Sequence, residues 1–396
     1  MSRSPSGPYY LAMQMEALEA AREMLPLITR HRGETESARR IAQPVVEALR
    51  KARLCRLAIP RELHGLELPT TDALDVYEML AGAEASVGWI VWNNTLPSFW
   101  GRFLGPAARA EIFGNPDWLY ACSTRPTGKA VVEGNGYRVT GRWSLVSGCE
   151  LSEWLALRCT VEENGQPRML QPGVPEARMI FLRRSEIEIL DTWHTGGLRG
   201  TGSHDVIVTA RFVARAHSCS PLDGSSLGGA VGCVPIVCNM AAGYGAQLLG
   251  LGRIAVDALI ELSRNKPVVD AGPGLGERPA VLAAIASTQA QIAAARDFLR
   301  ARVAQLWAEA EAGQRTVPSI AAVYAAAHHA MAQGRAAVSA MYALAGASSL
   351  YTSSPLERAH RDMHAMAAHV IAQPMWLEDT GRIALGLKSL NPLYLI

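Results

Sequence analysis

Apolar residues spaced three or four positions apart mark the N-terminal part of the chain as helical. Ile41, Val45 and Leu49 would share one face of a helix, and residues 13–22 consist largely of strong helix formers. Another helix is expected over residues 71–80, which begin with residues that favour helix N-termini. We therefore predict an N-terminal helical domain over residues 1–115.

The pattern changes to alternating β-forming residues after Pro116. Residues 131–143 alternate around Gly-Asn-Gly at 134–136, a composition typical of a hairpin turn. Further runs of β-forming residues, separated by turns that contain glycine or proline, lie at 154–161, 178–182, 187–190 and 205–213. Short strands in such number indicate a small barrel or sandwich, and we predict a central β-barrel domain over residues 116–225.

Alanine-rich periodic segments dominate residues 226–396. Three long helical runs are expected at 278–311, 318–347 and 355–386, and helices of this kind pack as a four-helix bundle. The segment 224–252 has no charged residue and is long enough to span a bilayer. Its many glycines and Pro235 instead favour a linker followed by a buried central helix, so no membrane partner is expected.

The composition is that of a globular protein. The chain has 396 residues, of which 49% are hydrophobic and 19% charged, and its formal net charge is +2. No stretch combines clustered Lys and Arg with interleaved aromatics, so nucleic acid is not expected as a partner. Seven scattered cysteines without a Cys-x-x-Cys pair, and an N-terminus without an apolar signal segment, favour a cytoplasmic protein. No metal site is expected, because the His328-His329 pair lacks further ligands at helical spacing.

Four segments carry candidate chemistry. Residues 120–128 read YACSTRPTG, residues 141–148 read GRWSLVSG, and residues 191–206 form a glycine-rich loop with many hydroxyls. Near the C-terminus, residues 361–370 read RDMHAMAAHV. Each segment alone has an ordinary structural explanation, as a polar turn, a satisfied strand serine or a helical histidine. Together and in this order they resemble the acyl-CoA dehydrogenase superfamily, and the resemblance covers nearly the whole chain.

This resemblance implies a mainly α protein with an acyl-CoA dehydrogenase-like fold: an N-terminal helical domain, a β-barrel middle domain and a C-terminal four-helix bundle. In the dehydrogenases, a glutamate that removes a substrate α-proton follows the Arg of the Arg-Asp pair by nine residues. Here that position is Val370. Arg125 likewise stands where the dehydrogenases carry an acid before Pro126. The chain therefore most resembles the two-component flavin-dependent monooxygenases of this fold, which use reduced flavin and O2 through a C4a-hydroperoxide.

The resemblance also implies which residues hold the flavin, either FADH2 or FMNH2. Ser147 is expected beside flavin N5 and His369 near the site of oxygen chemistry, and these two are the predicted catalytic residues. A helical path from Asp362 would place His369 on nearly the same helix face as Asp362. The resemblance implies further cofactor-binding residues: Cys122, Ser123, Thr124, Trp143, Val146, Arg278 and Gln289. Of these, Arg278 and Gln289 would reach the pyrophosphate of the flavin in a neighbouring subunit.

An unusual aromatic cluster lies between residues 89 and 100, with Trp89, Trp92 and Trp100 beside two asparagines. Aromatic walls with a few amides suit a flat aromatic substrate, although tryptophans that pack between helices are an equal alternative. The predicted substrate-binding residues are Trp92, Asn93, Asn94 and Leu96. The segment lacks the histidine that phenol-hydroxylating relatives often carry, and it resembles the branch that oxidises indole-acetate.

The implied partners are a separate NAD(P)H-dependent flavin reductase, O2, a small aromatic substrate and further copies of the chain in a homotetramer. Two alternatives remain open. One is an acyl-CoA dehydrogenase whose base has moved, for example to Glu150 or Glu378. The other is a flavin-free scaffold without enzymatic activity.

Overall fold

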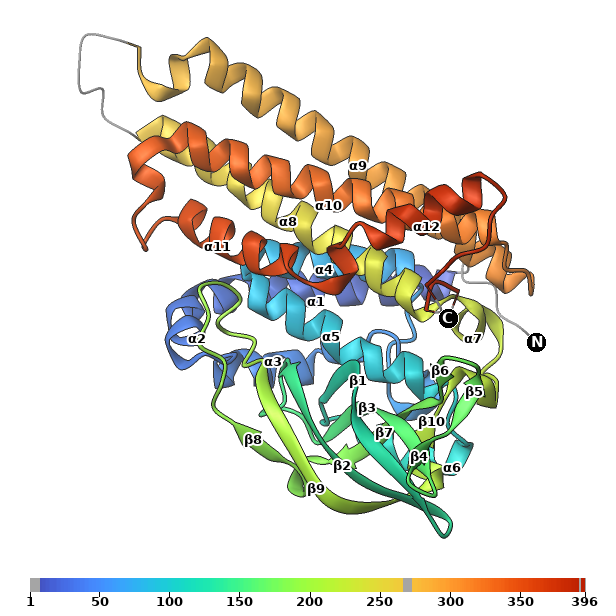
Figure 1. Cartoon of the computed structure of the whole chain (residues 1–396). Helices are drawn as coiled ribbons and strands as arrows, with labels where there is room; N and C mark the ends of the chain where they lie inside the picture. The colour runs from blue at the N-terminus through green and yellow to red at the C-terminus, as the bar shows by residue number, and fades with distance from the viewer. Residues whose placement is uncertain (1–7, 266–272, 392, 396) are drawn as a thin grey trace.

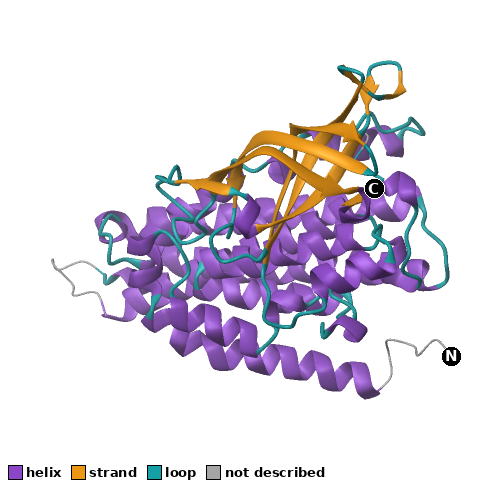
Figure 2. Cartoon of the chain, turned by 90° about the horizontal axis from the view of Figure 1, so that it is seen from below, coloured by secondary structure: helices purple, strands orange, loops and turns teal. Residues whose placement is uncertain are grey.

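Helices form the body of the molecule, and a β-sheet packs on one side of it (Figures 1 and 2). The computed structural model describes residues 8–265, 273–391 and 393–395. The first helices are α1 (Pro8–Arg30), α2 (Arg32–Ala38), α3 (Gln43–Lys51), α4 (Thr70–Ala83), α5 (Ala85–Gly101) and α6 (Pro106–Phe113). Val45 and Leu49 share α3, but Ile41 does not lie on a helix with them: α2 ends before the left-handed Arg39, and α3 begins only at Gln43. Helix α5 is buried along nearly its whole length, which places its tryptophans inside the molecule.

The middle of the chain consists of strands, as predicted. They are β1 (Tyr120–Glu133), β2 (Gly136–Val146), β3 (Trp154–Glu163), β4 (Gln166–Pro167), β5 (Met169–Gln171), β6 (Val174–Pro175), β7 (Ala177–Arg183), β8 (Glu188–Leu190), β9 (His204–Ala214) and β10 (Ser218–Cys219). The expected hairpin joins β1 and β2: Glu133 pairs with Gly136, and Gly134 takes φ +55° in the two-residue turn.

Most of the strands belong to one eight-stranded sheet. Its hydrogen-bonded order is β10-β7-β3-β1-β2-β9-β8, and within the described residues the two outer strands do not pair with each other. The mainly helical fold with a central β domain is as predicted, and closure of the sheet into a barrel stays a prediction. Strand alternation specifies the buried face of a strand but not whether the two edges of a sheet meet.

The C-terminal part is helical again. Its helices are α7 (Gly229–Cys233), α8 (Ile236–Asn265), α9 (Pro279–Glu311), α10 (Val317–Ala345), α11 (Pro355–Ala367) and α12 (Met375–Ala384). Short 3-10 turns connect the elements: η1 (Leu54–Arg56), η2 (Arg61–Leu63), η3 (Arg184–Glu186), η4 (Arg215–His217), η5 (Pro221–Asp223), η6 (Leu275–Glu277), η7 (Gly346–Ser349) and η8 (Val370–Ala372). The domain boundaries expected at residues 115 and 225 fall in connecting segments, and they remain a prediction.

The uncharged segment forms the central helix α8, which is buried from Ile236 to Gly252. Its glycines permit close packing: a Cβ added at Gly250 would lie 2.2 Å from the carbonyl oxygen of Glu78 on α4. In the described part of the chain, no helix is both long and apolar enough to cross a bilayer. All seven cysteines are free thiols.

One predicted helix is interrupted. Residues 355–386 form α11, then η8, then α12, rather than a single run. Pro374 gives the physical reason, because its ring clashes with the carbonyl four residues earlier and it has no N–H to donate. His369 lies in this break, so the expectation that it shares a helix face with Asp362 is wrong.

Candidate active site

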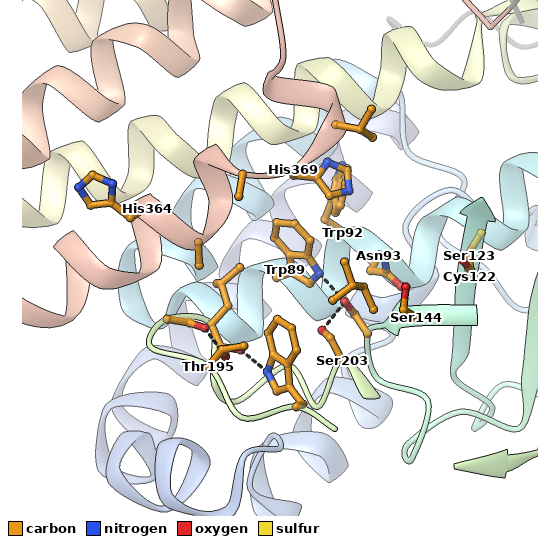
Figure 3. A pocket seen from close by; sticks show the side chains of 18 of the residues that line it. Trp89, Trp92, Asn93, Cys122, Ser123, Ser144, Thr195, Ser203, His364 and His369 are labelled. Atoms are coloured by element: carbon orange, nitrogen blue, oxygen red, sulfur yellow. Dashed lines mark hydrogen bonds between the residues drawn. The ribbon is translucent and has the colours of Figure 1, made fainter. Parts of the chain in front are cut away.

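A cavity of about 640 Å³ lies where the sheet meets the helical body (Figure 3). This volume is within the range of small-molecule sites. Its walls come from helix α5, strands β1 and β2, the glycine-rich loop, and the chain at the end of α11. The residues that line it are Trp89, Trp92, Asn93, Leu96, Cys122, Ser123, Thr124, Arg125, Ser144, Leu145, Ser147, Trp193, Thr195, Gly196, Gly197, Leu198, Ser203, Met240, His360, Arg361, His364, Ala365, Ala368, His369 and Val370.

A bulge in β2 turns several of its side chains toward the cavity. The pairing with β9 shifts between Trp143 and Val146, and Leu145 has a φ of +61° there. The extra residue leaves Ser144, Leu145 and Ser147 lining the cavity.

Trp143 and Val146 point the other way. Both are fully buried in the core of the β domain, and the Trp143 indole donates to the carbonyl oxygen of Arg158 at 2.8 Å. Neither lines the cavity, contrary to their predicted place at the cofactor. Side chains alternate across a strand, so flavin contacts cannot be assigned to consecutive residues of β2 alike.

Strand β1 contributes the predicted residues Cys122, Ser123 and Thr124, all of which line the cavity. The pairing of β1 with β3 shifts after Ser123, which frees the following turn from regular pairing. Burial raises the pKa of the Cys122 thiol to about 12, so this thiol stays protonated and unreactive. With Ser144, Ser147 and Ser203, the side chains of Ser123 and Thr124 form what we call the hydroxyl wall of the cavity.

A second part of the lining, which we call the helical wall, is formed by Trp89, Trp92, Asn93, Leu96 and His369. The His369 ring lies among three aromatic rings. Its centroid is 5.4 Å from that of Trp89, 6.1 Å from that of Trp92 and 5.5 Å from that of Tyr244 on α8. Figure 3 shows His369 beside Trp92, with His364 well apart from it on α11.

His369 is neutral at physiological pH. Burial, together with the nearby Arg125 guanidinium, lowers its pKa to about 4. Its Nδ1 accepts a hydrogen bond from the Ile371 N–H at 3.2 Å. A neutral imidazole that accepts at Nδ1 must carry its proton on Nε2, so Nε2 is the nitrogen that can donate.

The predicted substrate residues divide between the cavity and the core. Trp92, Asn93 and Leu96 line the cavity, but Asn94 does not. Consecutive residues of a helix differ by 100° in direction, so Asn94 points away from the cavity that Asn93 lines. Its amide accepts from the Tyr120 N–H at 2.7 Å and donates to the Ile90 carbonyl at 2.9 Å. The Asn93 amide is buried, and its oxygen has no hydrogen-bond partner among the described residues.

Arg278 and Gln289 lie away from this cavity. Both are exposed. Arg278 directly precedes α9 and donates to the Pro273 carbonyl at 3.5 Å, and Gln289 lies on α9 and borders a separate small pocket with Arg253 and Arg296. Their predicted contact would be made to a neighbouring subunit, and it stays a prediction.

No carboxylate lines the cavity among the described residues, and Val370 stands at the position of the dehydrogenase base. Glu150 instead lies 3.8 Å from the His204 ring, and Glu378 belongs to the first turn of α12. Neither candidate for a moved base reaches the cavity. The residues present therefore fit a flavin and an aromatic ligand, and they lack the group that removes an α-proton.

Several residues of the site were not assigned a role from the sequence. Ser203 and Thr201 bond to one another and, through Ser203, to Ser147. The hydroxyl-rich Thr-Gly-Ser run was visible in the sequence, but its partners were not. Tyr244 is hidden in an uncharged apolar run that gave no signal of a functional role.

Comparison with known proteins agrees with this geometry. Residues 242–374 match the family model of the acyl-CoA dehydrogenase C-terminal domain. In this match, in its fold and in the relatives described next, the chain is similar to flavin-dependent monooxygenases of acyl-CoA dehydrogenase fold.

The particular relatives are as follows. The chain is 25% identical over 358 residues to an indole-3-acetate monooxygenase of Acinetobacter baumannii, covering 90% of each chain. It is 28% identical over 372 residues to the flavin-dependent monooxygenase oxygenase subunit HsaA of Rhodococcus jostii, covering 91% of this chain and 94% of that protein. The solved structure of XiaF from a Streptomyces species, in complex with FADH2 and glycerol, shares the fold with a TM-score of 0.89 at 22% identity, over 96% of this chain and 98% of that one.

Proposed function

We propose that this protein is the oxygenase component of a two-component system, which uses reduced flavin and O2 to oxygenate a small aromatic compound of the indole type. The observation that carries the proposal is the pairing of the hydroxyl wall with a helical wall that holds neutral His369 and no carboxylate. A dehydrogenase with a moved base is not favoured, because Glu150 and Glu378 lie outside the cavity.

The hydroxyl wall is the proposed flavin-binding side. Reduced flavin, when bound, supplies the electrons that activate O2. Ser123, Thr124 and Ser147 offer short hydroxyls to the polar edge of the ring and to its side chain, and Cys122 lies beside them as an inert thiol. Arg125 adds a positive charge at the cavity that suits a phosphate, which both FMN and FAD carry.

The helical wall is the proposed oxygen and substrate side. The Nε2–H of His369 is a fixed donor, on a ring that packs among aromatic side chains. Trp92 and Leu96 offer apolar surface to a flat ring. The unpartnered Asn93 amide would bond a polar group of the substrate, such as an indole N–H.

The substrate class is inferred from this wall and from the relative whose name gives indole-3-acetate as its substrate. A separate NAD(P)H-dependent flavin reductase would supply the reduced flavin, as the name oxygenase subunit of HsaA implies for that relative. With the reduced flavin supplied by the reductase, the other substrates of this chain would be O2 and the aromatic compound.

A homotetramer is also proposed, built on the C-terminal helices. Helix α9 exposes Leu282 and Phe298 among its alanines, and small residues allow helices to approach closely. The exposed Arg278 and Gln289 would then face the flavin of a neighbouring subunit. Elution of the purified protein at the 42.6 kDa of a single chain in size-exclusion chromatography would contradict this part of the proposal.

The direct experiment mixes the protein with chemically reduced flavin, O2 and a panel of indoles and phenols. The proposal predicts an oxygenated product for at least one indole, with less free H2O2 when that substrate is present. Turnover of acyl-CoA thioesters with an artificial electron acceptor, and no product from any aromatic compound, would contradict it.

A further inference from the structure

A directional chain of hydrogen bonds runs from the cavity lining into the protein through three buried hydroxyls. The Trp89 Nε1–H donates to Ser147 Oγ at 2.9 Å, and Ser147 Oγ lies 2.7 Å from Ser203 Oγ. Ser203 Oγ lies 2.7 Å from Thr201 Oγ1, which donates to the Leu198 carbonyl oxygen at 2.8 Å. Figure 3 shows the part of this chain between Trp89 and Ser203.

Both ends of this chain fix its direction. An indole N–H can only donate and a carbonyl oxygen can only accept, whereas a hydroxyl has one proton. Thr201 donates its hydroxyl proton to the Leu198 carbonyl oxygen, so it accepts from Ser203. Because Ser203 donates its only hydroxyl proton to Thr201, it accepts from Ser147.

The consequence falls on Ser147. Its proton is committed to Ser203 and one of its lone pairs to Trp89, so only a second lone pair remains for the cavity. Toward a ligand, Ser147 is therefore an acceptor and not a donor. The flavin atom expected beside Ser147 is N5, which carries a proton in reduced flavin and only a lone pair in oxidised flavin.

We propose that Thr201 and Ser203 are positioning residues that select the redox state of the bound flavin. They hold Ser147 as an acceptor, which can bond the N5–H of reduced flavin but opposes the bare N5 of oxidised flavin. This inference rests on the proposed function, because it requires a flavin at the hydroxyl wall. It assigns a role to two residues of the glycine-rich loop, of which Thr201 does not line the cavity.

Thr201→Val is the sharpest test, because it keeps the side-chain shape and removes one hydroxyl. The Leu198 carbonyl would still accept from the Trp193 indole at 3.0 Å and from the backbone N–H at position 201 at 3.1 Å. Ser203 would lose its acceptor and could turn its proton to Ser147. Ser147 could then direct its own proton into the cavity, which reverses its character from acceptor to donor.

The measurement is anaerobic titration with oxidised and with reduced FMN and FAD, together with the midpoint potential of the bound flavin. The wild-type protein is expected to bind reduced flavin more tightly. Thr201→Val should lower that preference by about tenfold, since one hydrogen bond changes sign. For a two-electron couple, a tenfold change lowers the midpoint potential by about 30 mV. Thr201→Ser, which restores the hydroxyl, should return both values toward wild type.

Matched variants guard against a purely structural effect. Ser152→Ala removes another buried serine, which donates to the Gly148 carbonyl outside the chain described above, and it should leave the redox preference unchanged. Ser203→Ala should shift the preference in the same direction as Thr201→Val, and it serves if that variant does not fold. An unchanged preference in folded Thr201→Val or Ser203→Ala would overturn this inference alone. Failure of the wild-type protein to bind either form of flavin would overturn both this inference and the proposed function.

Discussion

The two walls of the cavity differ in how their polar groups are satisfied. On the hydroxyl wall, Ser147 and Ser203 belong to a closed chain of hydrogen bonds whose direction is fixed. On the helical wall, the Asn93 amide oxygen has no partner among the described residues, and Nε2 is the His369 nitrogen that can donate. A polar group that is already satisfied presents one defined character to a ligand, whereas an unsatisfied buried group needs a ligand to complete it. The hydroxyl wall therefore presents a fixed hydrogen-bonding pattern to the flavin, and the helical wall presents polar groups that the aromatic substrate can complete.

The largest predicted effect comes from the helical wall. His369→Ala should lower the rate of product formation by about 100-fold, because loss of one positioned hydrogen-bond donor to developing negative charge has an effect of this order. Flavin consumption should continue, with the missing product appearing as H2O2. The assay compares product with peroxide for each flavin oxidised.

His329→Ala is the control, since this histidine is exposed on α10 and packs against Phe298 rather than the cavity. Equal yields of product from His369→Ala and the wild-type protein would remove His369 from the account.

A second variant tests whether the helical wall binds the aromatic substrate and not the flavin. Asn93→Leu keeps the approximate size of the side chain and removes its polar groups, so KM for an indole should rise about tenfold. The dissociation constant of reduced flavin should not change. Steady-state kinetics and anaerobic flavin titration measure the two quantities on the same preparation. Weaker flavin binding with an unchanged KM would reverse the assignment of the walls.

Ser123→Ala makes the complementary change on the hydroxyl wall. Loss of one hydroxyl contact should weaken reduced flavin binding about threefold, while KM for the aromatic substrate stays the same. Thr127→Ala is a suitable control, because its hydroxyl donates to the Arg142 carbonyl on the exposed side of the strand. A shift in KM without a change in flavin affinity would contradict the assignment.

The smallest effect is on stability in acid. The pKa of His369 falls from its usual 6.5 to about 4 in the folded chain, so the unfolded chain binds a proton there that the folded chain does not. Stability must then decrease as the pH falls from 6.5 toward 4. His369→Gln lacks the titrating imidazole, so between pH 6.5 and pH 4 its melting temperature should fall by about 2 °C less than that of the wild-type protein. If the melting temperatures of the wild-type protein and His369→Gln fall by the same amount between pH 6.5 and pH 4, His369 is not a buried neutral group.

The sequence carried the order of the elements and part of the site. Alternation predicted the hairpin of β1 and β2, and the resemblance pointed to Ser147 and His369, which both line one cavity. It could not reveal the β2 bulge, which decides that Val146 turns into the core while Leu145 faces the cavity. A bulge is one extra residue in a strand, and it leaves no trace in the periodicity of a single sequence.

The remaining features depend on contacts between segments far apart in the chain. The fixed direction of the hydroxyl chain joins Trp89, Ser147 and Thr201, each from a different element. Asn94 likewise looked equivalent to Asn93 until its amide was found bonded to Tyr120 of β1. Local pattern indicates which residue types are present, but the choice between core and cavity is made by tertiary packing.

Labelling with ¹⁸O2 tests the central claim most directly. The protein, chemically reduced flavin and an indole substrate are mixed under labelled oxygen in ordinary water, and the product is analysed by mass spectrometry. The account predicts that the oxygen atom added to the aromatic product comes from O2. A product whose new oxygen comes from water, or the absence of any oxygenated product beside full conversion of O2 to H2O2, would contradict it.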